Sequence, residues 1–226
     1  MLLQEMNYGS STRPAIDQLV QEICEGDCGY ERGPDAQIPN GVISRLPILE
    51  CGSWVDPEVD NRNFVWARID VPGEPDLWAI SVHLLSTSAT KRHLEAVALL
   101  AEIDDAIPSD DLIVLGGDLN TNSRGEAAVV ELSSLFETGG PYPVDQNGDG
   151  DTNEPRSSPY DWVLADTDLS AHGTATIIGQ TVFPSGAVID TRIYQPLAEI
   201  APALAGDSGA PGMQHMAVVR DFVFTR

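Results

Sequence analysis

The chain has 226 residues, of which 42% are hydrophobic, and it carries 12 Lys and Arg against 35 Asp and Glu, a formal net charge of -23. Such an acidic surface repels nucleic-acid phosphates at long range, which counts against a chromatin or operator-binding protein. The net charge does not exclude an enzyme whose bound cations reverse the local potential. No apolar run approaches the ~20 residues that span a membrane, so we expect no transmembrane segment.

The N-terminal half is predicted to contain one helix and several strands, the first of them at the very start of the chain. The helix follows Ser11-Thr12, has Pro14 in its first turn and repeats apolar residues at helical spacing up to Ile23. Further strands are expected at residues 41–44, 64–70 and 77–83.

The C-terminal half is predicted to contain two helices, a few short strands and a long loop. Residues 91–106 form a helix that Pro108 stops, and residues 111–118 form a buried strand that ends on Asp118. After it we expect a helix at 125–135, a polar solvated loop at 139–159, and strands at 162–164 and 216–224. Strands interrupted by few helices predict an α/β protein with packed sheets, and the length suits a single domain over residues 1–226.

Three cysteines cannot all pair within one chain. Cys24 and Cys28 flank a tight Glu-Gly-Asp segment, so they are either a disulfide in an oxidising compartment or free thiols. A zinc site is disfavoured because no second Cys/His pair lies at ligand spacing. Residues 1–5 have neither a basic region nor a cleavable apolar stretch, so we expect no signal peptide in this sequence.

Several polar residues stand at or near the ends of the predicted strands, where sandwich folds carry their functional groups. They are Glu5, His83, Asp118, Asn120, Asp161 and His215. Carboxylates with two histidines suit a hard, oxygen-liganded cation and proton transfer better than a thiolate-bound metal or a covalent nucleophile. Taken singly, each could instead be a surface carboxylate, a structural histidine or a turn cap.

Six segments, in this order, carry a resemblance to a known family. They are Leu3-Gln4-Glu5, the Asn-Gly strand and turn at 40–48, Ser81-Val82-His83-Leu84, Gly117-Asp118-Leu119-Asn120, the Pro-Tyr-Asp segment at 159–164, and Gln214-His215 with the apolar residues after it. Together they resemble the endonuclease/exonuclease/phosphatase superfamily. The resemblance implies a four-layer α/β/β/α sandwich of two packed mixed β-sheets.

The resemblance also implies a reaction, the hydrolysis of a phosphodiester by water, assisted by Mg²⁺ or Mn²⁺. By analogy with the family, Glu5 and Asp118 hold the metal. Asp118 also orients or deprotonates the water, and Asn120 bonds the phosphate.

The remaining site residues have implied roles in proton transfer. Asp161 pairs with one histidine and fixes its tautomer, while His83 and His215 donate to phosphate oxygens or serve as acid and base. Which histidine has which role stays open.

Ser81-Val82-His83 and Pro159-Tyr160-Asp161 resemble the deoxyribonuclease version of the motifs. We therefore expect a nuclease-like phosphodiesterase, secreted or periplasmic, with a phosphoester substrate such as DNA and no stable protein partner. The alternatives are a sphingomyelinase-like lipid phosphodiesterase, which an exposed apolar insertion would favour, a phosphomonoester phosphatase, and a non-catalytic binding module.

Two departures from the family pattern stand out. The family's first strand precedes its Gln-Glu strand, so we expect an N-terminally truncated domain whose sandwich lacks that strand. Gln214 occupies the position where many members have a metal-coordinating aspartate, and a neutral amide supplies no negative charge. Asp207, seven residues before Gln214, is the acidic candidate to compensate.

Residues 145–153 resemble the first part of a calcium loop, with oxygen ligands at alternate positions and Gly150 sixth. Arg156 stands twelfth, where such a loop needs a bidentate Glu, so Ca²⁺ is the less favoured ion. Further candidates for phosphate contact are Tyr8, Asn40, Arg45 and Arg156, and we expect His93 and His172 to be solvated.

Overall fold

A five-stranded mixed sheet forms the centre of the molecule. The computed structural model describes residues 1–34, 37–73 and 75–224. The sheet consists, in spatial order, of β4 (Ile48–Val55), β5 (Asn63–Ile69), β6 (Leu77–His83), β7 (Leu112–Asp118) and β8 (Asp161–Ala165). β6 and β7 run parallel, and the other neighbours run antiparallel. The register places His83 opposite Asp118 and Asp118 opposite Asp161, so three of the predicted site residues share one end of the sheet.

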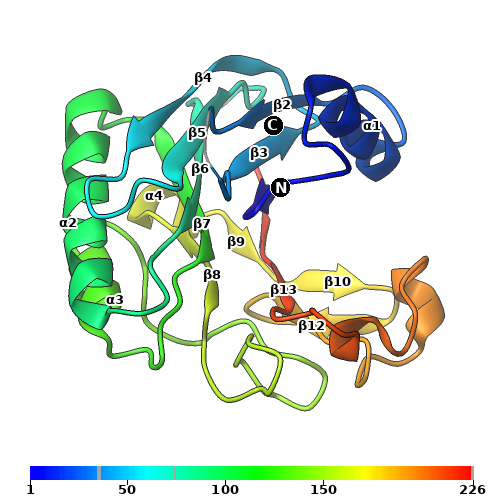
Figure 1. The fold of residues 1–226 in the computed structure, drawn as a ribbon. Coiled ribbons are helices and arrows are strands. Elements are labelled where there is room, and N and C mark those ends of the chain that lie inside the picture. Colours follow the sequence, from blue (N-terminus) through cyan, green and yellow to red (C-terminus); the bar gives the residue numbers. More distant parts are fainter. Residues whose placement is uncertain (35–36, 74, 225–226) are drawn as a thin grey trace.

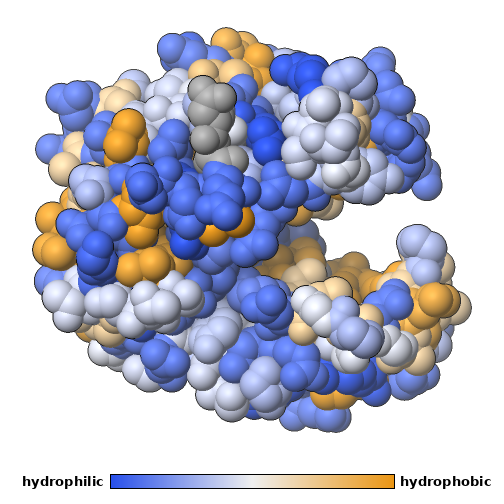
Figure 2. Space-filling model, in the orientation of Figure 1, coloured by the Kyte–Doolittle hydropathy of each residue, from blue (hydrophilic) through white to orange (hydrophobic). Residues whose placement is uncertain are grey.

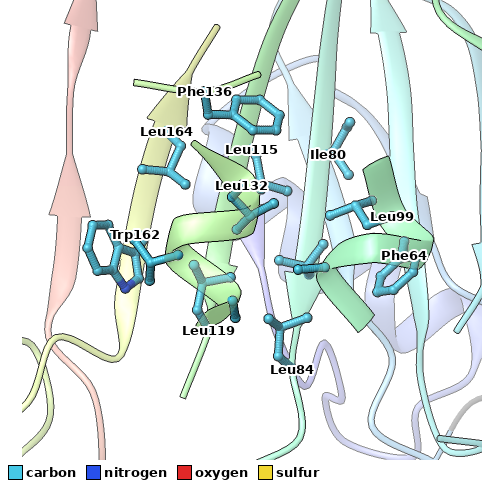
Figure 3. Close-up of a cluster of buried hydrophobic side chains, with 14 of the residues drawn as sticks. Phe64, Ile80, Leu84, Leu99, Leu115, Leu119, Leu132, Phe136, Trp162 and Leu164 are labelled. Carbon is cyan, nitrogen blue, oxygen red and sulfur yellow. The ribbon is translucent and has the colours of Figure 1, made fainter. Parts of the chain in front are cut away.

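Two helices, α2 (Ala89–Ala106) and α3 (Ala127–Leu132), cover one face of this sheet. Ser88 caps α2 by accepting a hydrogen bond from Lys91 N, at 3.3 Å. The cluster between helices and sheet includes Ile80 and Leu115 of the strands and Leu99 and Leu132 of the helices, all buried (Figure 3). A short helix, α4 (Thr167–Ser170), lies beside β7 and β8.

The opposite face of the central sheet meets a second, smaller sheet. Its strands are β1 (Leu2–Leu3), β3 (Gly41–Ser44) and β2 (Gly29–Arg32), in the order β1-β3-β2. Val42 of β3 packs inward against Val65 and Ala79 of the central sheet, while Ile43 packs outward beneath α1 (Arg13–Cys24). The layers therefore follow the order α, β, β, α (Figure 1), and the predicted α/β class with packed sheets is confirmed.

The C-terminal region extends the second layer with short antiparallel pairs. They are β9 (Gly173–Thr174) with β14 (Asp221–Phe222), β10 (Thr176–Ile178) with β11 (Thr181–Phe183), and β12 (Ala187–Ile189) with β13 (Ala217–Val219). Two 3-10 helices, η1 (Leu197–Ile200) and η2 (Asp207–Gly209), lie between β12 and β13 in the chain. Figure 2 shows a hollow between this region and the part around α1, with apolar side chains along its lower side.

Two smaller predictions concern cysteines and membranes. Cys24 and Cys28 form a disulfide where α1 ends, whereas Cys51 is an exposed free thiol. Among the described residues, no helix is both long enough and apolar enough to cross a membrane.

Candidate active site

The Gly-Gly pair before Asp118 lets β1 cross closely over the central sheet. A side chain at Gly116 would come within 2.6 Å of Leu2 Cδ1, and one at Gly117, whose φ is 148°, would come within 2.8 Å of Gln4 Nε2. Gln4 Nε2 donates to Ser81 Oγ at 3.1 Å, and Ser81 Oγ donates to the carbonyl of Leu3 at 2.8 Å. These bonds tie β1 to β6, so Glu5 comes close to His83.

Asn120 holds the carboxylate of Asp118 in place. Its backbone N–H donates to Asp118 Oδ1 at 2.7 Å, and its Nδ2 donates to Asp118 Oδ2 and to the carbonyl of Leu84, both at 2.9 Å. A left-handed backbone at Asn120, with φ of 51°, permits this geometry, and Asn tolerates that conformation better than most residues. Both amide hydrogens of Asn120 are therefore engaged within the protein.

His83 lies between two carboxylates. Its Nε2 is 3.3 Å from Asp118 Oδ2, and its Nδ1 is 3.9 Å from Glu5 Oε1. Burial lowers the pKa of His83 to about 3, and the positive charges of Arg62 and His215 contribute. A neutral ring follows, and its buried Nδ1 has no hydrogen-bond partner among the described residues.

His215 pairs with Asp161. His215 Nδ1 is 3.0 Å from Asp161 Oδ2, and its Nε2 points toward Asp118, 3.7 Å from Oδ2. Burial alone lowers the pKa of His215, but the hydrogen bond and charge of Asp161, with the charges of Asp118 and Glu5, raise it overall. Burial, together with repulsion from Asp161, raises the pKa of Asp118 to about 7. All six predicted strand-end residues therefore meet at this site, with Glu5 at its rim.

Three of these residues could share a metal ion. Asp118, Asp161 and His215 each offer a ligand atom, and these atoms lie within 4.8 Å of one another. Two carboxylates and an imidazole suit Mg²⁺ or Mn²⁺ better than a thiolate-bound metal. The expected metal pair was Glu5 and Asp118. Glu5 lies outside this cluster, with its side chain 60% exposed and facing His83.

Arg62 is a charged neighbour of the site that no sequence motif marks. It is only 6% exposed, its Nη1 has no hydrogen-bond partner among the described residues, and Nε donates to Asn61 Oδ1. Burial lowers the pKa of Arg62, and the carboxylates of Glu95, Asp118, Asp56 and Glu5 oppose that effect. Its unpaired donor could contact an anionic ligand at the site.

Glu95 is fully buried beside Arg62, and both of its oxygens accept from Leu85 N, at 3.1 and 2.9 Å. Burial, followed by its interaction with Asp56, raises the pKa of Glu95 well above its ordinary value of 4.5. Above pH 4.5 the unfolded chain loses the proton of Glu95, whereas the folded state keeps it up to a higher pH. The stabilising contribution of Glu95 therefore declines as the pH rises above 4.5.

We expect Glu95→Gln to gain stability relative to the wild type as the pH rises, because glutamine resembles the protonated acid. Thermal unfolding should give similar midpoints for the two proteins at about pH 5 and a higher midpoint for Glu95→Gln at about pH 9. Asp104→Asn, at an exposed position of α2, is the matched control. A pH-independent difference between Glu95→Gln and the wild type would contradict the raised pKa.

Other candidate residues have partners elsewhere. Arg45 donates to the carbonyl of Cys24, and Asp207 accepts from Leu204 N. His93 and His172, which were predicted to be solvated, are partly exposed and also have partners within the protein. His93 pairs with Glu131 at 3.0 Å, and the half-buried ring of His172 packs against Phe224, because each lies where two elements meet.

Tyr8 packs against the cluster beneath α1, and Asn40 is buried with its Nδ2 bonded to the carbonyl of Asn63. Arg156 bonds within its own loop, to Asp145. Among the described residues, no hydrogen bond or ion pair joins the side chains of these three residues to those of the site.

A cavity of about 330 Å³ adjoins the site on the side of β8. Its lining includes Asp161 and Thr152 at one end and the rings of Tyr142 and Trp162. Arg220 also lines it, and donates to the carbonyl of Val163 at 3.0 Å. Asp161 lines the cavity, whereas His83, Asp118 and His215 are not among its lining residues.

The sequence profile of the Endonuclease/Exonuclease/phosphatase family matches residues 1–185. No curated protein matches the chain significantly.

Several solved structures share the fold. A conserved protein of unknown function from Enterococcus faecalis V583 has a TM-score of 0.60 at 12% identity, covering 91% of this chain and 82% of its own. D. rerio TDP2 complexed with a single-strand DNA product has a TM-score of 0.59 at 16% identity, over 99% and 85% of the two chains. An endonuclease/exonuclease/phosphatase family protein from Leptotrichia buccalis C-1013-b has a TM-score of 0.58 at 15% identity, over 99% and 86%. At these identities the likeness concerns the fold alone.

Proposed function

The chain belongs to the endonuclease/exonuclease/phosphatase family, and from this premise we propose that it is a metal-dependent phosphodiesterase that hydrolyses its substrate with water. One observation carries the proposal. The His215–Asp161 pair, with its 3.0 Å hydrogen bond, directs His215 Nε2 to within 3.7 Å of Asp118 Oδ2. A proton donor and a proton acceptor thus lie side by side, so both could reach the oxygens of a phosphoryl group bound next to them.

In the proposed reaction, water attacks phosphorus in line with the leaving oxygen. Asp118 accepts the proton of the attacking water while the new P–O bond forms. His215 donates its Nε2 proton to the leaving oxygen as the old P–O bond breaks. Asp161 holds the His215 ring in the orientation that this transfer needs. Neutral His83 and the unpaired Nη1 of Arg62 hydrogen-bond the phosphoryl oxygens.

Mg²⁺ or Mn²⁺ would be held by Asp118 with Glu5, and would neutralise phosphoryl charge when bound. Glu5 is the better companion because Asp161 already accepts a hydrogen bond from His215. The exposed Glu5 carboxylate, in contrast, has free oxygens near the rim of the site. Its mutation should therefore weaken metal binding more than it disturbs the His215–Asp161 pair.

DNA is the substrate that we favour, because the Ser-Val-His and Pro-Tyr-Asp segments that resemble deoxyribonucleases supply His83 and Asp161. The net charge of -23 makes a bound cation all the more necessary for a polyanionic substrate. We also propose a secreted or periplasmic location, which the Cys24–Cys28 disulfide supports.

A lipid phosphodiester is the second candidate, and one surface feature favours it. The hairpin of β10 and β11 exposes Ile177 and Val182, at 66% and 56%, directly opposite one another in the register. Paired exposed apolar residues on a hairpin could insert among lipid headgroups. Assays with both substrate types distinguish the two candidates.

The first experiment treats the protein with EDTA and then assays it with Mg²⁺, Mn²⁺ or Ca²⁺. The substrates are plasmid DNA, sphingomyelin vesicles, an aryl phosphodiester and an aryl phosphomonoester. We expect EDTA to abolish plasmid nicking and aryl phosphodiester cleavage, and Mg²⁺ or Mn²⁺ to restore both. Activity that resists EDTA would contradict metal dependence, and no activity on any substrate would favour a binding module.

Glu5→Gln serves as the second arm of this experiment. We expect the Mg²⁺ concentration for half-maximal rate to rise by about 10-fold or more, because outer partners of metal sites alone have effects of that size. Glu22→Gln, on the exposed side of α1, is the matched control. An unchanged Mg²⁺ requirement in Glu5→Gln would contradict Glu5 as a metal ligand. It would favour the cluster of Asp118, Asp161 and His215 as the metal site instead.

A further inference from the structure

The acidic loop before Asp161 is closed around its own arginine. Asp145 is only 3% exposed, and its Oδ1 accepts from the backbone of Asn147 and Asp149, at 2.8 and 3.0 Å. Its Oδ2 accepts from Arg156 Nη2 at 2.7 Å. The same nitrogen donates to the carbonyl of Asp149 at 3.0 Å. One guanidinium thus joins the two ends of the loop.

Further carboxylates converge on the same group. Arg156 Nε lies 3.4 Å from Asp149 Oδ2 and 3.8 Å from Asp190 Oδ2, and the Arg156 side chain is only 10% exposed. A left-handed backbone at Arg156, with φ of 57°, turns the chain there. In a calcium loop of this spacing, the oxygens at the first and fifth positions and a bidentate Glu at the twelfth surround the ion. In this chain the twelfth residue is Arg156, so a guanidinium supplies the positive charge that Ca²⁺ supplies in a calcium loop.

The loop is hydrogen-bonded to both halves of the histidine–aspartate pair. Thr152, only 2% exposed, accepts from Asp161 N through its Oγ1 and from Met216 N through its carbonyl, both at 2.7 Å. Asn153 forms an antiparallel bridge with His215. The loop therefore fixes the backbone of Asp161 and that of His215 from one side.

We propose that Arg156 is an internal cation, standing where a calcium loop holds its ion, and that it keeps the 145–156 loop in the shape that aligns Asp161 with His215. Arg156 and Thr152 are then positioning residues that act through this pair. The kinetic consequence rests on the proposed function, whereas the alignment of the pair does not. Measurements that need no catalysis and a kinetic measurement therefore separate a failure of the alignment from a failure of the proposed function.

The first measurement follows the pair directly. Proton NMR should show a low-field Nδ1–H resonance for His215, identified by its loss in His215→Gln. We expect the resonance to vanish or broaden in Arg156→Gln and in Thr152→Val, and to persist in Thr152→Ser, which keeps the hydroxyl. Thr176→Val, which removes another buried hydroxyl in β10, should leave it unchanged. A resonance that is intact in both Arg156→Gln and Thr152→Val would overturn the proposal, even if the wild type hydrolyses nothing.

The second measurement uses kinetics on the aryl phosphodiester. Arg156→Gln and Thr152→Val should lower kcat by about 10- to 100-fold with little change in KM, as is usual for residues that orient a site. Thr152→Ser should recover most of the rate, and Thr176→Val should match the wild type. A changed KM with unchanged kcat would assign the loop to substrate binding and overturn the positioning role.

The third measurement replaces Arg156 by glutamate, the residue that a calcium loop has at its twelfth position. Arg156→Glu should bind Ca²⁺ in calorimetry, whereas the wild type and Arg156→Gln should show no heat from this loop. Ca²⁺ should also restore the His215 resonance in Arg156→Glu and not in Arg156→Gln. If circular dichroism shows that Arg156→Glu is folded and it still binds no Ca²⁺, the guanidinium does not occupy the cation position.

Discussion

His215→Ala is expected to lower kcat on an aryl phosphodiester by about 10²- to 10⁴-fold, the usual contribution of a positioned acid or base. The ring is held by Asp161 through a 3.0 Å hydrogen bond and has its free nitrogen directed at Asp118. Its removal takes away the proton donor but leaves Asp118 and Glu5 in place. KM and the Mg²⁺ requirement should therefore change much less than kcat, which initial rates over a range of substrate and Mg²⁺ concentrations would measure.

Two further measurements make this prediction specific. Added imidazole should partly restore the rate of His215→Ala, because its protonated form can occupy the place of the lost ring and donate a proton to the leaving oxygen. His93→Ala, which removes a histidine of α2 that pairs with Glu131, is the matched control and should keep the wild-type rate. A rate for His215→Ala within about 3-fold of the wild type would remove His215 from the chemistry, since one positioned group accounts for far more than that.

The central sheet could be predicted from the sequence because its strands carry their own signals. Continuous apolar runs end on His83 and on Asp118, and the observed β6 and β7 end on those residues. α2 was also predicted to end at Ala106, where it does end. Such segments are buried along their length, so hydrophobic pattern and structure agree.

The edges of the fold could not be predicted in the same way. β4 spans Ile48–Val55, yet much of it is exposed, and it exists because it pairs with β5. The last strand was expected at 216–224, whereas the chain there changes partners, with β13 pairing to β12 and β14 to β9. Pairing between segments distant in the chain decides these strands, and a local pattern contains no information about it.

The site shows the same division between local and long-range information. Strand ends predicted which polar residues were candidates, but the register of three strands is what sets His83, Asp118 and Asp161 side by side. Arg62 was missed because buried charges have no local signature. The loop at 139–159 was expected to be polar and solvated, which is wrong in part, because Asp145 and Thr152 are buried by their hydrogen bonds.

A second large effect is expected from Arg92 of α2, which is 1% exposed beneath the loop that follows His83. Its Nε donates to Glu126 Oε1 at 2.6 Å, and its Nη1 donates to the carbonyls of Leu85 and Ser86, at 2.8 and 3.1 Å. Arg92→Met removes these donors and leaves the Glu126 carboxylate buried without its partner. We expect the free energy of unfolding in urea to fall by about 3–5 kcal/mol.

The double variant Arg92→Met with Glu126→Gln separates the lost attraction from the stranded charge. Glutamine keeps an acceptor for Asn122 N, which Glu126 Oε2 binds at 3.1 Å, and removes the uncompensated carboxylate. If the stranded charge causes most of the loss, the double variant should be more stable than Arg92→Met alone. Arg13→Met breaks an exposed pair with Asp17 and should cost less than about 1 kcal/mol. Equal losses for Arg92→Met and the double variant would instead assign the effect to the unsatisfied carbonyls of Leu85 and Ser86.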